Sequence, residues 1–169
     1  MEINASGLTV RAPLHASEAE IKAFLEAHRG WIEAHMQRWQ QRQAQLAELP
    51  PLTTAELRDL AAQAREVIAA RVAYYAPQVG VTYGKITIRT QRSRWGSCSA
   101  NGNLSFNCLL MLAPPEVLDS VVVHELCHRK QMNHSAAFYA QVLRVFPEYR
   151  KWNAWLRENG PLLLLRATE

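Results

Sequence analysis

The sequence lacks the features that mark secreted and membrane proteins. Its three cysteines are an odd and sparse set, which argues against a disulfide framework and fits a reducing compartment such as the cytoplasm. The first residues include Glu2 and Asn4 and have neither the basic start nor the apolar run of a signal peptide. No apolar stretch approaches the roughly 20 residues that a transmembrane helix needs. We therefore expect a cytoplasmic protein that does not use a membrane.

A strong charge of either sign is also absent. The 169 residues include 19 basic and 15 acidic side chains, for a formal net charge of +4. This mild excess permits an anionic ligand but does not require a nucleic acid as partner. The 49% apolar content suffices for the core of one domain. We expect a single domain over residues 1–169, with an N-terminal strand and helix extension at 1–50 and the core at 51–160.

Two capping boxes predict the starts of the first two helices. Ser17 is followed by Glu20 and Thr53 by Glu56, and apolar residues recur at helical spacing behind each pair. A short extended segment should precede the first helix, which should end at the paired prolines that follow residue 49. The second helix should end near Gly80.

The hydrophobic period then changes from helical to alternating. Residues 85–89 predict a strand, and two more are expected around 95–98 and 104–108, joined by the hairpin signal Asn101-Gly102. Three helices are expected to follow, over about 114–131, from 135 onward and over about 147–160. This order of elements predicts the α+β class.

The stretch VVVHELCHRKQMNH, at residues 121–134, carries the candidate chemistry. His124 and His128 lie four residues apart, so on a helix they project from one face about one turn apart, as two ligands of one tetrahedral ion must. Val117 and Val121 continue the same stripe, which makes the two imidazoles face inward. Buried imidazoles are costly unless a partner such as a metal satisfies them.

A catalytic zinc site needs a third protein ligand and one open position. His134 is the best candidate, because it lies past the expected helix end and Asn133 tolerates a turn back toward the site. The alternative third ligand is Glu148. Glu125 lies about 60° around the helix from His128. From there it can accept a proton from a metal-activated water without ligating the metal.

Other histidines and cysteines have more ordinary interpretations. His28 and His35 follow the apolar stripe of the first helix, so packing or partial exposure is expected. Cys127 flanks the two motif histidines on the side away from Glu125 and is interpreted as a small core thiol.

The spacing HExxHxxxxxH also occurs in the metzincins, but Gln131 stands where they carry a glycine, and no methionine follows His134 to form their Met-turn. The chain instead resembles the YgjP-like (SprT-like, WLM) metal-dependent hydrolases over nearly its whole length. The segments that carry this resemblance are RWGSC at 94–98, residues 104–110 with Asn107, VVVHELCHRKQMNHSAAFY at 121–139, and, near the N-terminus, VRAP at 10–13 and Trp31-Ile32.

This resemblance implies a zincin-like core, in which a small antiparallel sheet lies beside the HExxH helix after N-terminal helices. It implies Zn²⁺ as cofactor, with His124, His128 and His134 as ligands and Glu125 as the catalytic residue. It does not fix the substrate, because SprT-like relatives are linked to proteolysis on DNA, whereas a member of the group has been assigned a nucleoside triphosphate pyrophosphatase activity on UTP.

Three functions are compatible with these features. The first is a metallopeptidase, whose peptide or protein substrate pairs with the edge of the RWGSC strand. The second is a UTP pyrophosphatase in which Arg89, Arg92 or Arg94 binds phosphate, although a solvated strand face also accounts for these arginines. The third is a binding module with a structural zinc, against which the intact Glu125 argues. We predict the first, a zinc-dependent hydrolase of the metallopeptidase type with Glu125 as general base.

Overall fold

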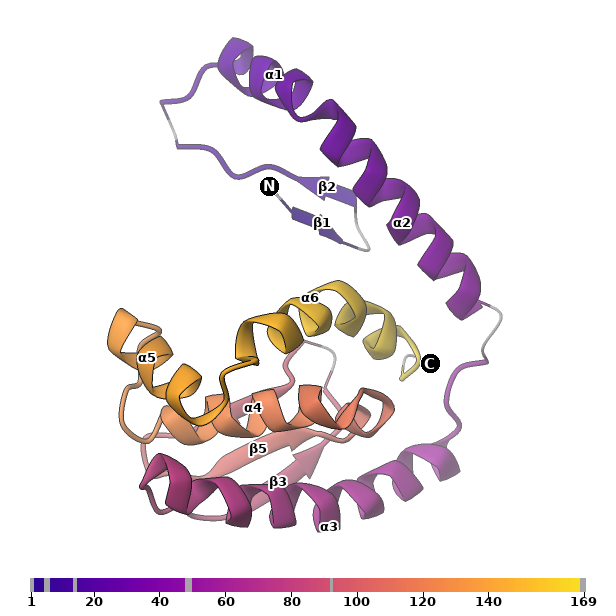
Figure 1. The fold of residues 1–169 in the computed structure, drawn as a ribbon. Coiled ribbons are helices and arrows are strands. Elements are labelled where there is room, and N and C mark those ends of the chain that lie inside the picture. The colour runs from indigo at the N-terminus through magenta and orange to yellow at the C-terminus, as the bar shows by residue number, and fades with distance from the viewer. Residues whose placement is uncertain (1, 5–6, 14, 48–49, 92, 168–169) are drawn as a thin grey trace. The chain divides into compact units, whose positions relative to one another are not determined.

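The computed structural model describes residues 2–4, 7–13, 15–47, 50–91 and 93–167. The chain divides into two compact units, Met1–Pro50 and Pro51–Glu169 (Figure 1). Across the described residues, no helix combines the length and the apolar character that crossing a membrane requires.

The N-terminal unit contains a short hairpin and two helices. Strands β1 (Glu2–Asn4) and β2 (Gly7–Thr9) pair antiparallel. Helix α1 (Glu18–Ala27) begins at the predicted capping box, and helix α2 (Arg29–Ala47) follows it directly. The single helix expected here is thus interrupted at His28, whose φ of −110° departs from helical geometry and whose Nδ1 lies 2.8 Å from the Phe24 carbonyl oxygen.

The core unit opens with the long helix α3 (Thr54–Val79). Its predicted capping box is formed by Thr53 and Glu56, and it ends at Gly80, whose φ of 76° is left-handed. Both predicted ends are therefore confirmed. One face of α3 is buried, and the side chains that it contributes to the core are Ala64, Ile68, Val72, Tyr75, Ala76 and Val79.

Three short strands form the sheet, in the order β3-β5-β4. These are β3 (Ile86–Arg89), β4 (Gly96–Cys98) and β5 (Leu104–Asn107). The predicted hairpin joins β4 to β5 antiparallel, with Gly102 at a φ of 81° in the turn. However, β3 pairs with β5 in parallel, so the sheet is mixed and the expectation of an antiparallel sheet was wrong. The chain passes from β3 to the far side of β5 before it returns, which gives β3 and β5 the same direction.

The remaining elements are the 3₁₀ helix η1 (Cys108–Leu112) and the helices α4 (Pro115–Cys127), α5 (Ala136–Val145) and α6 (Tyr149–Leu165). Helix α4 ends earlier than the predicted residue 131, because the chain tightens into a turn in which Arg129 N–H donates to Leu126 O. Helix α6 continues through Gly160 and Pro161, where a stop was predicted. Gly160 packs against Trp95, whose ring would lie 3.0 Å from an added Cβ, and Leu162 is buried, so tertiary packing outweighs the local signal.

Helix α4 is the most buried element of the core unit. It contacts α3, α5, α6 and β4, and Figure 1 shows it running over the sheet beside α3 and α6. Ten of its thirteen residues are buried. An almost wholly buried helix can place polar groups at a water-poor site, which matters for the histidines and the glutamate at its C-terminal end.

Candidate metal centre

Three imidazoles converge at the C-terminal end of α4. His124 lies in the last turn of the helix, His128 caps it and His134 lies in the segment before α5. The Nε2 atom of His124 lies 3.1 Å from that of His128 and 3.0 Å from that of His134. Ligand nitrogens about 2.05 Å from a tetrahedral zinc are about 3.3 Å apart. Both distances are close to this spacing, and the ligand atoms of the three histidines all lie within 4.8 Å of one another, so the group can hold a single ion.

Electrostatics at this cluster also favour a cation. Burial, followed by the charges of His128 and His134, lowers the pKa of His124 to about 3. Burial likewise lowers the pKa of His128. Neutral imidazoles are the form that ligates metals. With His124 and His128 neutral, Nε2 lone pairs come close together at the cluster, and a cation there turns their repulsion into attraction.

A main-chain contact fixes the proton of His128. Its Nδ1–H donates to the carbonyl oxygen of Gln131 at 3.0 Å, which leaves the Nε2 lone pair for the cluster. The acceptor exists because the turn after α4 folds back on the helix end. Ser135 then starts α5 by accepting the N–H of Phe138 at 3.3 Å, and His134 is held directly before this cap.

Phe138 joins the three histidines from the first turn of α5. Its ring centroid lies 4.9 Å from that of His124, 4.7 Å from that of His128 and 5.0 Å from that of His134. The side chain is fully buried. The sequence predicted a helix from residue 135 onward but did not connect Phe138 with the histidines. Its place four residues after His134, behind the Ser135 cap, is the signal that could have linked it to the site.

Tyr149, the first residue of α6, completes the surroundings of His124. Its hydroxyl oxygen lies 2.8 Å from His124 Nδ1, and the residue is 4% exposed. Burial raises the pKa of this hydroxyl above its ordinary value. Because 25 residues separate the two side chains, no local pattern in the sequence could have paired them.

The other candidate ligands lie apart from the cluster. Glu148 is exposed and pairs with Lys151 at 3.2 Å, and it is absent from the histidine group found among the described residues. Cys127 is buried, and burial raises the pKa of its thiol to about 11, as expected for a core thiol. His28 is exposed and His35 stacks on Trp31 within α2.

Glu125 lies buried beside the strand β4. It is 5% exposed, and burial raises the pKa of its carboxyl group to about 8. No described residue forms a hydrogen bond or an ion pair with it. A Cβ atom at Gly96 would lie 2.6 Å from Glu125 Oε1, so the glycine of the RWGSC segment is what lets strand and carboxylate approach so closely. A buried, unpaired carboxylate is costly and is typical of functional sites.

The strand next to Glu125 has a free edge. β4 lies at one end of the strand order, and β5 is the only strand of the described chain that pairs with it. The carbonyl oxygen of Trp95 and the N–H group of Ser99 each form a hydrogen bond of 2.9 Å on the side of β4 that faces β5. Because alternate residues of an antiparallel pair face the partner strand, the backbone groups of Gly96 and Cys98 face the open edge.

Asn107 holds the segment that leads into β4. The side chain is 1% exposed. Its Nδ2 donates to the carbonyl oxygens of Gln91 and Arg94 at 2.7 and 3.1 Å, while its Oδ1 accepts the N–H of Leu109 at 3.1 Å. One buried amide thus ties the RWGSC segment to the start of η1.

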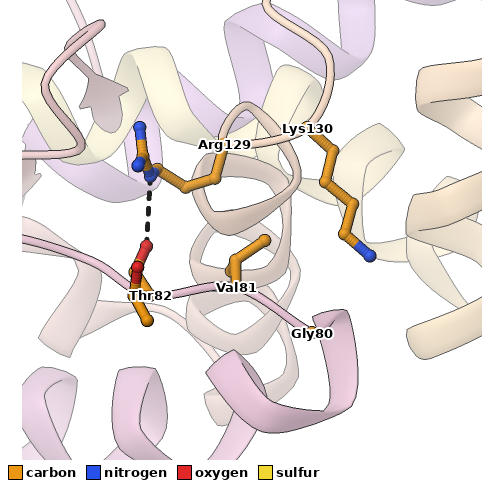
Figure 2. Close-up of a pocket in the computed structure, with 5 residues that line it drawn as sticks. All are labelled: Gly80, Val81, Thr82, Arg129 and Lys130. Carbon is orange, nitrogen blue, oxygen red and sulfur yellow. Dashed lines mark hydrogen bonds between the residues drawn. The ribbon is translucent and has the colours of Figure 1, made fainter.

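Among the described residues, no arginine near the motif forms a hydrogen bond or an ion pair with the histidine cluster. Arg89 and Arg94 are exposed, and Arg92 lies outside the described residues. Arg129 donates to the carbonyl oxygens of Thr82 and Ala100 at 3.1 Å each. Figure 2 shows it at a pocket of about 540 Å³, lined by Gly80, Val81, Thr82, Arg129 and Lys130. Since α3 and α4 both end here, these cations offset the carbonyl-rich ends of two helices.

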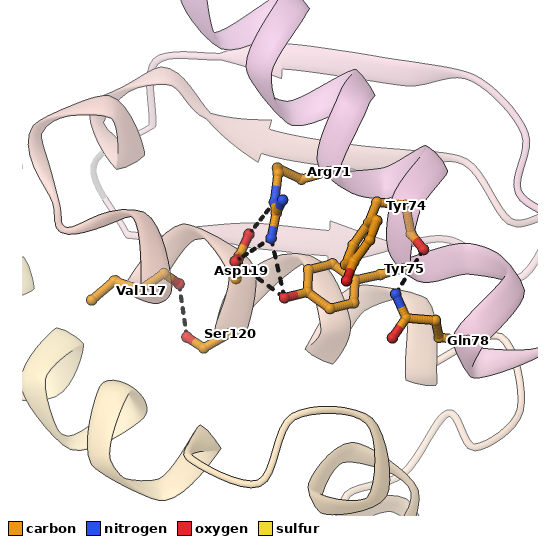
Figure 3. A network of polar contacts seen from close by, with 7 residues as sticks. All are labelled: Arg71, Tyr74, Tyr75, Gln78, Val117, Asp119 and Ser120. Atoms are coloured by element: carbon orange, nitrogen blue, oxygen red, sulfur yellow. Dashed lines mark hydrogen bonds and ion pairs between the residues drawn. The ribbon is translucent and has the colours of Figure 1, made fainter.

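An ion pair fixes α4 against α3 (Figure 3). Arg71 forms a two-pronged contact with Asp119, with both nitrogen–oxygen distances at 2.6 Å. Tyr75 also donates to Asp119, at 3.1 Å. Asp119 lies five residues before His124 on α4, so this network sets the position of the helix that carries the histidines.

Comparison with known proteins identifies the family of the chain. No curated protein matches the chain. Among solved structures, the crystal structure of the metallopeptidase zymogen abylysin from Pyrococcus abyssi is similar, with a TM-score of 0.49 and 21% identity, and the match covers 53% of this chain and 90% of that one. The model of the YgjP-like, metallopeptidase domain family matches residues 1–57 and 53–159. The chain therefore belongs to the YgjP-like family of metallopeptidase domains, as its RWGSC and HELCH segments predicted.

Proposed function

We propose that the protein is a zinc-dependent peptidase that cleaves peptide bonds in extended peptides or unfolded proteins. The observation that carries this proposal is the juxtaposition of three convergent imidazoles, a buried unpaired glutamate and a free strand edge. Each alone has a structural explanation, but together they supply the metal ligands, the base and the substrate track that peptide hydrolysis needs.

In this proposal His124, His128 and His134 hold the metal, and three imidazoles with an open fourth position suit catalytic zinc. When bound, zinc polarises the scissile carbonyl and lowers the pKa of water. Glu125 accepts the proton of the attacking water and delivers it to the leaving amine nitrogen. Its raised pKa reflects burial, and a cation nearby would favour the carboxylate form that a base requires.

The free edge of β4 orients the substrate. An extended peptide that pairs with Gly96 and Cys98 adds a strand to the sheet next to Glu125. Gly96 contributes here in two ways, because its backbone faces the edge while its missing side chain makes room for the carboxylate. A peptide needs main-chain pairing of this kind, whereas a nucleotide does not use it.

The two alternative functions lack an observation of their own. For a UTP pyrophosphatase, the two described candidates for phosphate binding, Arg89 and Arg94, are exposed, and Arg129 is already engaged by two carbonyl oxygens. For a structural zinc module, a buried and unpaired Glu125 would be a cost without a purpose. The three free cysteines are compatible with the reducing cytoplasm that we propose as the location.

A hydrolysis screen of the zinc-loaded protein tests the proposal. The panel contains peptides, denatured proteins and nucleoside triphosphates, with Glu125→Gln as the inactive variant and Glu116→Gln, an exposed change in the first turn of α4, as the matched control. We expect peptide-bond cleavage by the wild type and by Glu116→Gln, and its loss in Glu125→Gln with the zinc retained. Turnover of UTP without any peptide cleavage would contradict the proposal.

A further inference from the structure

The contact between Tyr149 and His124 points to a role for Tyr149 in the metal centre. We propose that Tyr149 is a positioning residue, whose hydroxyl oxygen accepts the Nδ1–H of His124 and so directs the Nε2 lone pair toward the metal. This inference rests on the proposed metal site. It assigns a task to a residue that lies outside the HExxH motif.

The position of the ring proton decides which imidazole nitrogen can bind a metal. A neutral histidine carries one ring proton, on either Nδ1 or Nε2. His124 aims Nε2 at the cluster, 3.1 and 3.0 Å from the other two Nε2 atoms, so a metal-binding His124 must carry its proton on Nδ1. The only described group within hydrogen-bonding distance of that Nδ1 is the hydroxyl of Tyr149, at 2.8 Å.

Each of the three histidines satisfies its Nδ1 atom in a different way. His128 uses the main-chain carbonyl oxygen of Gln131, which a side-chain substitution does not remove. His134 is exposed, so solvent can satisfy its Nδ1. His124 is half-buried, and the partner of its Nδ1 is a side chain on another helix. Among the described ligand contacts, the contact with Tyr149 is therefore the one that mutation can delete cleanly.

The position of Tyr149 is well defined. Its ring is nearly parallel to that of His124, with centroids 5.9 Å apart and planes at 18°. Its backbone N–H donates to Phe146 O at 3.0 Å as α6 begins. The hydroxyl lies at the Nδ1 edge of the imidazole, whereas the metal would lie beyond the Nε2 edge. Tyr149 consequently acts through His124 and does not touch the reacting atoms.

Zinc affinity measured by chelator competition is the direct test. Tyr149→Phe keeps the ring and removes only the acceptor, and loss of such an outer partner weakens metal binding roughly 10- to 100-fold. Tyr139→Phe is the matched control, because Tyr139 lies against His134, with ring centroids 6.2 Å apart, but its hydroxyl bonds no described histidine. We expect the control to bind zinc within about twofold of the wild type, and only Tyr149→Phe to shift the visible spectrum of the cobalt-loaded protein.

A measurement on the unmutated protein covers the case in which Tyr149→Phe fails to fold. In the ¹⁵N-labelled zinc form, NMR should show a proton on His124 Nδ1 that exchanges slowly with water. Ligation through Nδ1 instead would overturn the inference. Unchanged zinc affinity in a folded Tyr149→Phe variant would also overturn the inference. In that case, loss of zinc in His124→Ala would leave the proposed function standing. A wild type that binds no zinc would refute both.

Discussion

Replacing Gly96 with alanine places a methyl group against the proposed general base. The added Cβ would lie 2.6 Å from Oε1, 2.7 Å from Cγ and 2.9 Å from Cδ of Glu125. Ordinary carbon contacts are about 3.5–4.0 Å, so the carboxylate must retreat by about 1 Å. A misplacement of this size costs roughly 100-fold in rate, or about 2.7 kcal/mol of transition-state stabilisation. We therefore expect Gly96→Ala to retain zinc and to lose roughly 100-fold in kcat.

The assay compares kcat and KM on an unfolded protein substrate, together with zinc content and thermal stability. Gly84→Ala is the matched control, since its Cβ would meet Asn103 Oδ1 at 2.5 Å, a clash of similar severity that involves no proposed catalytic group. We expect Gly84→Ala to lower stability but not kcat. The reasoning would be refuted if both variants lost activity in proportion to their stability, or if Gly96→Ala retained full activity.

Two further predictions concern stability. Arg71→Ala should lower the free energy of unfolding by about 2–3 kcal/mol in urea denaturation, because it leaves the nearly buried Asp119 without its charged donor; Arg65→Ala, an exposed change on the same helix, should have little effect. In the metal-free protein, Glu125→Gln should be more stabilising at pH 9 than at pH 4. In the folded protein the pKa of Glu125 is about 8, which exceeds the ordinary value of 4.5. The contribution of Glu125 to folding stability is therefore complete below pH 4.5 and is lost as the pH rises through 8. Equal effects of Glu125→Gln at both pH values would contradict this.

The sequence predicted elements whose signals are local. The capping boxes at Ser17 and Thr53, the stop at Gly80 and the hairpin at Gly102 each depend on a few neighbouring residues, and the structure has all of them. The predictions were wrong where contacts between residues far apart in the sequence determine the structure. Helix α6 runs past Gly160 because Trp95 packs there. The parallel pairing of β3 with β5 depends on the path of the chain around the sheet, which no short pattern specifies.

The same distinction between local signals and distant contacts applies to the candidate site. The HExxH spacing places two imidazoles and a carboxylate at one end of α4, because a helix repeats every 3.6 residues. The surroundings of these groups come from three other elements, with Gly96 on β4, Phe138 on α5 and Tyr149 on α6. A motif thus specifies which groups are present, whereas the packing of α4 against its neighbours determines their protonation and their room to move. Burial depresses the pKa of His124 and raises that of Glu125. Both pKa shifts show that burial disfavours the charged form of the side chain. A single cation that the imidazoles bind and that stabilises the carboxylate would offset both costs at once.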